Sequence, residues 1–167
     1  MKIDQRFAIR CSLLLLPLVV LANYATAESK SSKYACSEPN PAQLCNTSNT
    51  CGSASTPCTV DVKRTANAAS STPSIPNARS NALFCVNPGT TVTWKSTGKD
   101  IGFVVDVGPS SPFEPPGAII GGTDRAVSVV AKKTGCYKYS AGACMSGAIY
   151  GMCGTAKAEL IITGGSN

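Results

Sequence analysis

The chain has 167 residues, carries a net charge of +6 and contains no histidine. Without histidine it lacks the usual general base near neutral pH, and both Ser-His-Asp and Cys-His nucleophile pairs are excluded, so we expect a protein that is not an enzyme. The basic residues are scattered and aromatic residues do not interleave with them, so the pattern predicts no nucleic-acid partner.

The first 27 residues, 1–27, predict a signal peptide. A positively charged start precedes the apolar run 12–22, and the small residues 25–27 offer a cleavage site. The apolar run is too short to span a bilayer comfortably, so we favour a cleaved signal over an anchor helix. Removing 27 residues from 167 leaves 140, which is enough for one periplasmic or extracellular domain without a membrane partner.

The cysteines predict disulfide bonds. Nine cysteines, less Cys11 in the signal, leave eight in the mature chain, and an even number in an exported chain is typical of an oxidising compartment. Many pairings are possible, and the sequence does not choose among them. Structural zinc is the rival, but it would need four thiolates, and closely spaced cysteine pairs are missing. The eight residues are Cys36, Cys45, Cys51, Cys58, Cys85, Cys136, Cys144 and Cys153.

Residues 28–58 predict a Cys-rich extension ahead of a main domain that spans 59–167. The segment is rich in Ser, Asn, Thr, Ala and Pro and has few large apolar side chains, so it cannot bury enough surface to order itself. Two disulfides, each contributing roughly 2–4 kcal/mol, would hold it as a loop-rich segment packed on the main domain.

Short segments with strand patterns fill the main domain. In residues 90–95, Val92 and Trp94 alternate with threonines, directly after an Asn-Pro-Gly turn. The Ala-, Ser- and Pro-rich residues 66–80 predict a connecting loop, and the Pro-rich residues 108–117 predict another. Sustained helical periodicity is absent after the signal, so we predict an all-β sandwich. The expected strands are 59–63, 82–86, 90–95, 101–107, 126–130, 136–139 and 158–163.

Two parts of the main domain resemble the cupredoxins, the blue-copper proteins. Cys85-Val-Asn-Pro-Gly-Thr-Thr-Val-Thr-Trp94 resembles the two strands and turn in the first half of a cupredoxin domain. Gly135-Cys-Tyr-Lys-Tyr139 and Gly151-Met-Cys-Gly154 resemble the segments on either side of the copper-ligand loop. The resemblance covers residues 82–163 and implies a Greek-key β-sandwich of cupredoxin type.

The resemblance also implies where a type 1 copper site would lie, and its imidazoles are missing. Such a site uses two histidines, a thiolate and usually a weak thioether. The family pattern places one histidine within 98–103 and the other within 140–150, and neither segment contains one. The thiolate falls near Ala141 or Cys144, and Met152 fits the axial position. Composition therefore excludes a conventional blue-copper centre formed by this chain alone.

Two hypotheses remain for the sulfur-rich segment. Cys144-Met145 and Met152-Cys153 nearly mirror one another, and free thiolates with thioethers would suit Cu(I). A disulfide between Cys144 and Cys153, with both methionines as adaptable packing, is the interpretation that export and the even cysteine count favour.

We therefore expect a binding or structural module without a cofactor. Cross-links would replace the rigidity that a metal gives to the loop end, and the loops 108–117 and 140–151 would offer a rigid surface to an unknown protein or surface partner. A copper-binding or electron-transfer protein is the first alternative. An exported Cys-rich inhibitor is the second, and it would need a cleavable exposed loop such as 108–117.

Overall fold

The computed structural model describes residues 36, 39–145 and 153–164. The predicted signal peptide, the first part of the extension and Met152 lie outside these residues. No helix among the described residues is long and apolar enough to cross a membrane. Their elements are η1 (Pro41–Leu44), β1 (Cys58–Thr65), β2 (Ala68–Pro73), β3 (Phe84–Val86), β4 (Thr91–Lys95), β5 (Ile101–Asp106), β6 (Phe113–Glu114), β7 (Ile119–Gly122), β8 (Val127–Ala131), β9 (Gly135–Met145) and β10 (Gly154–Ile162).

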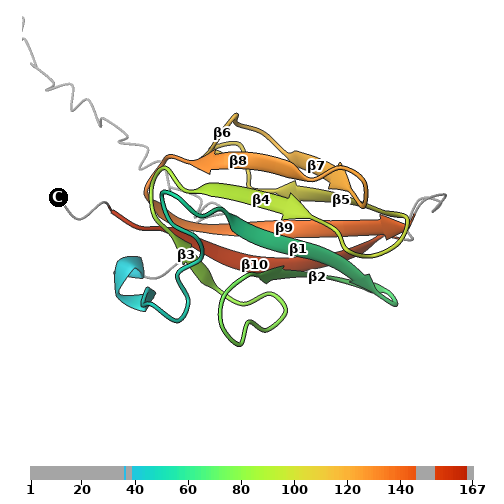
Figure 1. The fold of residues 1–167 in the computed structure, drawn as a ribbon, viewed down its shortest axis with the longest axis horizontal. Coiled ribbons are helices and arrows are strands. Elements are labelled where there is room, and N and C mark those ends of the chain that lie inside the picture. The colour runs from blue at the N-terminus through green and yellow to red at the C-terminus, as the bar shows by residue number, and fades with distance from the viewer. Residues whose placement is uncertain (1–35, 37–38, 146–152, 165–167) are drawn as a thin grey trace, which may run out of the picture. The chain divides into compact units, whose positions relative to one another are not determined.

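The strands form two five-stranded sheets that pack face to face (Figure 1). The first sheet has the order β2-β1-β4-β8-β6, and the second has the order β3-β10-β9-β5-β7. From β2 to β9 every connection passes from one sheet to the other, whereas β1–β2 and β9–β10 are antiparallel neighbours. The expected all-β Greek-key sandwich is therefore confirmed.

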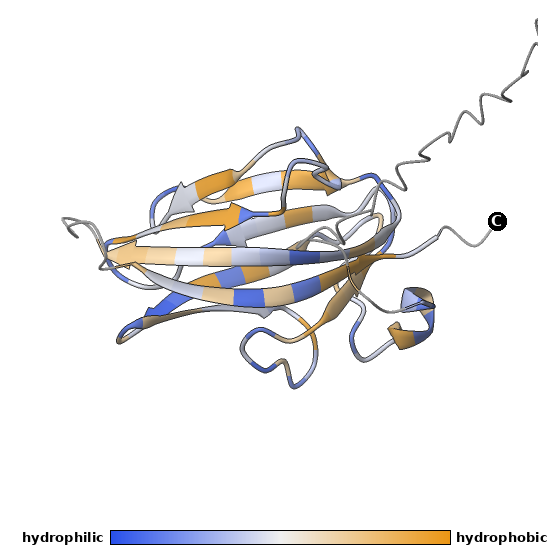
Figure 2. Ribbon diagram, turned by 180° about the vertical axis from the view of Figure 1, so that it is seen from behind, coloured by the Kyte–Doolittle hydropathy of each residue, from blue (hydrophilic) through white to orange (hydrophobic). Residues whose placement is uncertain are grey.

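The core lies between the sheets because side chains alternate along each strand. Val92 and Trp94 of β4 are fully buried, while Thr93 faces outward and its hydroxyl meets that of Ser128 at 2.9 Å. Trp94 packs against Tyr139 of the other sheet. Their rings are in an edge-to-face arrangement, with centroids 5.3 Å apart. Figure 2 shows the resulting alternation of polar and apolar residues along several strands.

The prediction of a loop over residues 66–80 is wrong, because β2 occupies much of this segment. β2 pairs with β1 from Val60↔Pro73 to Thr65↔Ala68. The small residues of β2 reflect close packing against β10 rather than a loop. A Cβ added to Gly154 of β10 would clash with the backbone of Ala68. Only small side chains fit where these two strands approach.

Three other segments also differ from the expected elements. β7 was not predicted, and its Gly121 leaves room for the ring of Phe103, which would lie 2.5 Å from an added Cβ. β9 continues to Met145, so residues 140–145 are strand rather than loop. β6 lies inside the predicted loop 108–117. In β7 and β9, glycine and alanine removed the strand signal that larger residues give.

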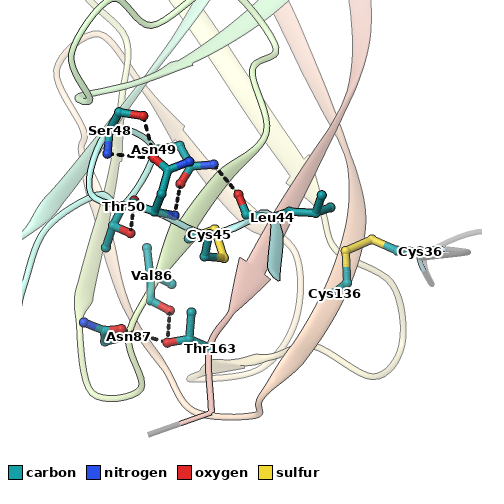
Figure 3. The surroundings of a disulfide bond; sticks show 12 residues. Cys36, Leu44, Cys45, Ser48, Asn49, Thr50, Val86, Asn87, Cys136 and Thr163 are labelled. Atoms are coloured by element: carbon teal, nitrogen blue, oxygen red, sulfur yellow. Dashed lines mark hydrogen bonds between the residues drawn. A yellow bond between two sulfur atoms is a disulfide. The ribbon is translucent and has the colours of Figure 1, made fainter. Parts of the chain in front are cut away.

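The described part of the extension packs on the edge strand β3. Thr50 forms a parallel bridge with Cys85, and the Cys51 N–H donates to the Cys85 carbonyl at 2.7 Å. Figure 3 shows the disulfide at Cys45 beside this contact, where the side-chain amide of Asn49 donates to the Leu44 carbonyl at 2.8 Å. Backbone pairing thus covers one edge of the second sheet.

Eight cysteines among the described residues form four disulfides, of which only one lies within residues 28–58. Cys51–Cys58 closes a short loop ahead of β1, whereas the other two cysteines of the extension bond to the main domain. The extension is therefore fastened to the sandwich rather than cross-linked mainly to itself. The pairs are Cys36–Cys136, Cys45–Cys85, Cys51–Cys58 and Cys144–Cys153.

The two glycines at positions 154 and 102 give a matched test of the packing. Gly154→Ala should lower the free energy of unfolding by about 1–3 kcal/mol, because its Cβ meets the β2 backbone. Gly102→Ala has open space around its Cβ, so it should be neutral or stabilise by up to about 1 kcal/mol. Urea unfolding measures both, and equal effects would contradict the close approach of β2 and β10.

Tyr139 is a buried polar group between the sheets. Its hydroxyl lies 2.8 Å from that of Ser71, whose backbone N–H donates to the side-chain oxygen of Asn81 at 2.9 Å. Burial raises the pKa of Tyr139 well above its ordinary value of 10.0, because the low-polarity core disfavours phenolate.

This burial makes stability depend on pH in alkaline solution. Above pH 10.0 the unfolded chain releases the Tyr139 proton while the folded chain retains it. The contribution of the Tyr139 proton to the free energy of unfolding is therefore fully present below that pH. It is lost above that pH, by up to about 1.4 kcal/mol per pH unit. Tyr139→Phe should unfold more easily near neutral pH but show a shallower alkaline decline. Urea midpoints across the pH range measure this, and an unchanged slope would contradict it.

Candidate functional site

The strand register brings the two halves of the copper pattern together at one end of the second sheet. Ile101 of β5 is opposite Met145 of β9, and Gly102 is opposite Cys144. The segment 98–103 therefore lies beside the end of β9. Of the predicted sulfur residues, Cys144, Met145 and Cys153 gather here, whereas Met152 is outside the described residues.

A disulfide occupies the position where the metal hypothesis requires free thiolates. Cys144 and Cys153 are bonded, with their Cα atoms 4.3 Å apart, next to the paired residues Ala143 and Gly154. Two thiolates exist at this position only after reduction of that bond. Within the described ranges, no group of three or more His, Cys, Asp or Glu residues could hold a metal ion.

A cavity of about 440 Å³ borders the disulfide. Thr123 shapes its rim: its hydroxyl accepts from the Ile101 N–H at 2.9 Å and donates to the Gly98 carbonyl. This links the turn before β5 to the turn after β7. The cavity is lined by Asp100, Ile101, Gly102, Ile120, Gly121, Gly122, Thr123, Asp124, Arg125, Cys144 and Met145.

Exposed apolar side chains lie on and beside this cavity. Ile120 is 62% exposed, Met145 is 54% exposed, and Val104, the cross-strand partner of Ile120, is 39% exposed. Gly142 is opposite Val104 on the other side, so no side chain there covers the valine. We call Val104 and Ile120, which are cross-strand partners on the outer face of this sheet, the apolar patch. Sequence analysis did not identify Val104 or Ile120, because only the β5–β7 pairing places them together.

Of the loop expected over residues 140–151, residues 140–145 belong to β9 and residues 146–151 lie outside the described residues. The other expected loop, residues 108–117, comes shortly after β5 in the chain. Part of the second loop is also buried: Phe113 packs against Trp94 with ring centroids 6.5 Å apart.

A second cavity, of about 810 Å³, lies against the middle of β9 and β10. Ser140 is opposite Lys157 on one side and Asp106 on the other, and the neighbouring Lys138 is 4.0 Å from Glu159. This polar row combines β9 and β10 with β5, which is distant from them in sequence, so no motif indicated it. The lining residues are Asn81, Leu83, Asp106, Lys138, Tyr139, Ser140, Lys157, Ala158 and Glu159.

Comparison with known proteins returns a structural similarity only. No protein-family model matches the chain, and no curated protein matches its sequence. Among solved structures it is similar to the oxidized form of an amicyanin mutant, with a TM-score of 0.35 and 15% identity, over 69% of this chain and 93% of that one. The fold class rests on the two sheets described above.

The disulfide makes a prediction about copper. Oxidised protein titrated with Cu(II) should give no intense thiolate-to-copper absorption in the visible range, because Cys144 and Cys153 are bonded and histidine is absent. Mass spectrometry of the unreduced protein serves as the control, because it establishes before the titration how many free thiols the sample contains. An intense band at one copper per chain, without added reductant, would contradict the prediction.

Proposed function

We propose that this chain is an exported, disulfide-stabilised, cupredoxin-like domain that lacks a type 1 copper site and acts as a binding module. The main support is the disulfide between Cys144 and Cys153 at the position of the family's ligand loop. Cross-links are typical of exported proteins and restrain a strand end as metal ligands would. Four disulfides among the described residues fit an oxidising compartment.

The apolar patch is the surface that we assign to the partner, which we take to be a protein. Ile120 and Met145 line a cavity whose rim carries both signs of charge, from Asp124 and Arg125. An apolar centre with a charged rim is the usual composition of a protein interface. The patch also lies on regular strands, so its backbone is already ordered before binding and little backbone entropy is lost on association.

Site-directed cross-linking tests this assignment. A photoreactive residue replaces Ile120 in one variant and Lys157 in a control variant, since both side chains are exposed on the same sheet. Irradiation in the exported fraction of the source cells should yield a protein adduct from position 120 and none of the same mass from position 157. Identical adducts, or none from position 120, would contradict the assignment.

Affinity measurements with the purified partner then give the magnitude. Ile120→Lys should weaken binding by about tenfold or more, which corresponds to about 1.4 kcal/mol, because it places a charge at the apolar centre. Lys157→Gln should leave the affinity unchanged. Thermal unfolding should stay nearly the same for both variants, since exposed substitutions usually change stability by less than about 0.5 kcal/mol. Unchanged affinity for Ile120→Lys would overturn the role of the patch.

A further inference from the structure

The four disulfides differ in how exposed their cysteine residues are. Cys51 and Cys58 are both fully buried, and Cys85 is fully buried on its side of the bond to Cys45. Both cysteines of the pair at Cys136 are half-buried. Among the described cysteines, Cys153 alone is exposed, and its partner Cys144 is half-buried. A dissolved thiol therefore reaches the Cys144–Cys153 bond most easily.

The same disulfide is also one of the two that join residues close together in the chain. It spans 9 residues, whereas Cys36–Cys136 spans 100 and Cys45–Cys85 spans 40. Short loops restrict the unfolded chain least, so their cross-links contribute least to stability in the loop-entropy model. Backbone pairing also joins β9 and β10, from Gly154↔Ala143 to Ile162↔Gly135. We therefore expect the sandwich to stay folded when this bond opens.

We propose that Cys144–Cys153 is an exchangeable disulfide and that the Cys153 sulfur is a modification site for small thiols. The thiolate of a low-molecular-weight thiol attacks Cys153 Sγ, and the bond to Cys144 breaks. A new sulfur–sulfur bond joins Cys153 to the small thiol, and Cys144 leaves as a thiolate that takes up a proton. One disulfide replaces another, so the step needs no oxidant. The inference does not depend on the proposed partner.

The surroundings of the bond favour this site over the other short-range disulfide. The cavity of about 440 Å³ is lined by Cys144, the cysteine that leaves as a thiolate in the proposed step. Cys51–Cys58 spans a similar 7 residues but is fully buried. It is therefore a control with a similar loop length that a dissolved thiol does not reach. Because Ile120 lines the same cavity as Cys144, the bond that breaks lies near the apolar patch.

Peptide mapping tests the proposal on the native full chain. Reduced glutathione is added without denaturant, free thiols are then trapped with iodoacetamide, and the modified cysteines are located by mass spectrometry. We expect glutathione on Cys153 and alkylation on Cys144, at least about tenfold faster than at any other cysteine. The double variant Cys144→Ser with Cys153→Ser should stay folded and take up no label.

Three results would overturn the proposal. Glutathione could appear first at Cys36–Cys136, which would show that burial does not set the order of exchange. It could appear on Cys144 instead of Cys153, which would reverse the point of attack. Labelling of Cys144–Cys153 could also keep pace with that of the buried Cys51–Cys58, which would mean that exchange requires global unfolding. Because the assay contains no partner, its outcome is separate from that of the binding experiments.

Discussion

The contact between Trp94 and Tyr139 sets the arrangement on which the other features depend. Trp94 comes from the middle strand of one sheet and Tyr139 from the middle strand of the other. Because side chains alternate along a strand, an inward Tyr139 also turns Ala141 and Ala143 inward and Cys144 outward. A shift of one residue would reverse these faces, placing the polar side chains of β9 in the core. Core packing therefore fixes the position of the disulfide at the sheet end.

Sequence reasoning identified the strands whose alternation is carried by large residues. The segment with Val92 and Trp94 is one example, because β-branched and aromatic side chains both favour strands and fill the core. It failed where neighbouring strands approach closely, as at β2 and at Gly121 of β7. At those positions only small residues fit, and small residues in a single sequence are typical of loops as well.

The candidate site was predictable only in part, for a related reason. The pairing of Cys144 with Cys153 was one of two interpretations of a local pattern, and their separation of 9 residues made it readable from sequence. The apolar patch and the polar row at Ser140 depend instead on which strands are neighbours. Val104 and Ile120 are 16 positions apart in the chain and meet only through the β5–β7 register. No periodicity within one segment contains that information.

The attachment of the extension to β3 limits how copies of this domain can associate. A sheet normally has two edges whose backbone groups can accept a further strand, and stacking through both gives open-ended fibres. In the second sheet, residues 49–51 of the extension already pair with the β3 edge, which leaves β7 as the other edge. Growth through one edge ends once two copies have met. The extension thus blocks one edge of this sheet, so that edge-to-edge contact through the remaining edge gives a closed dimer.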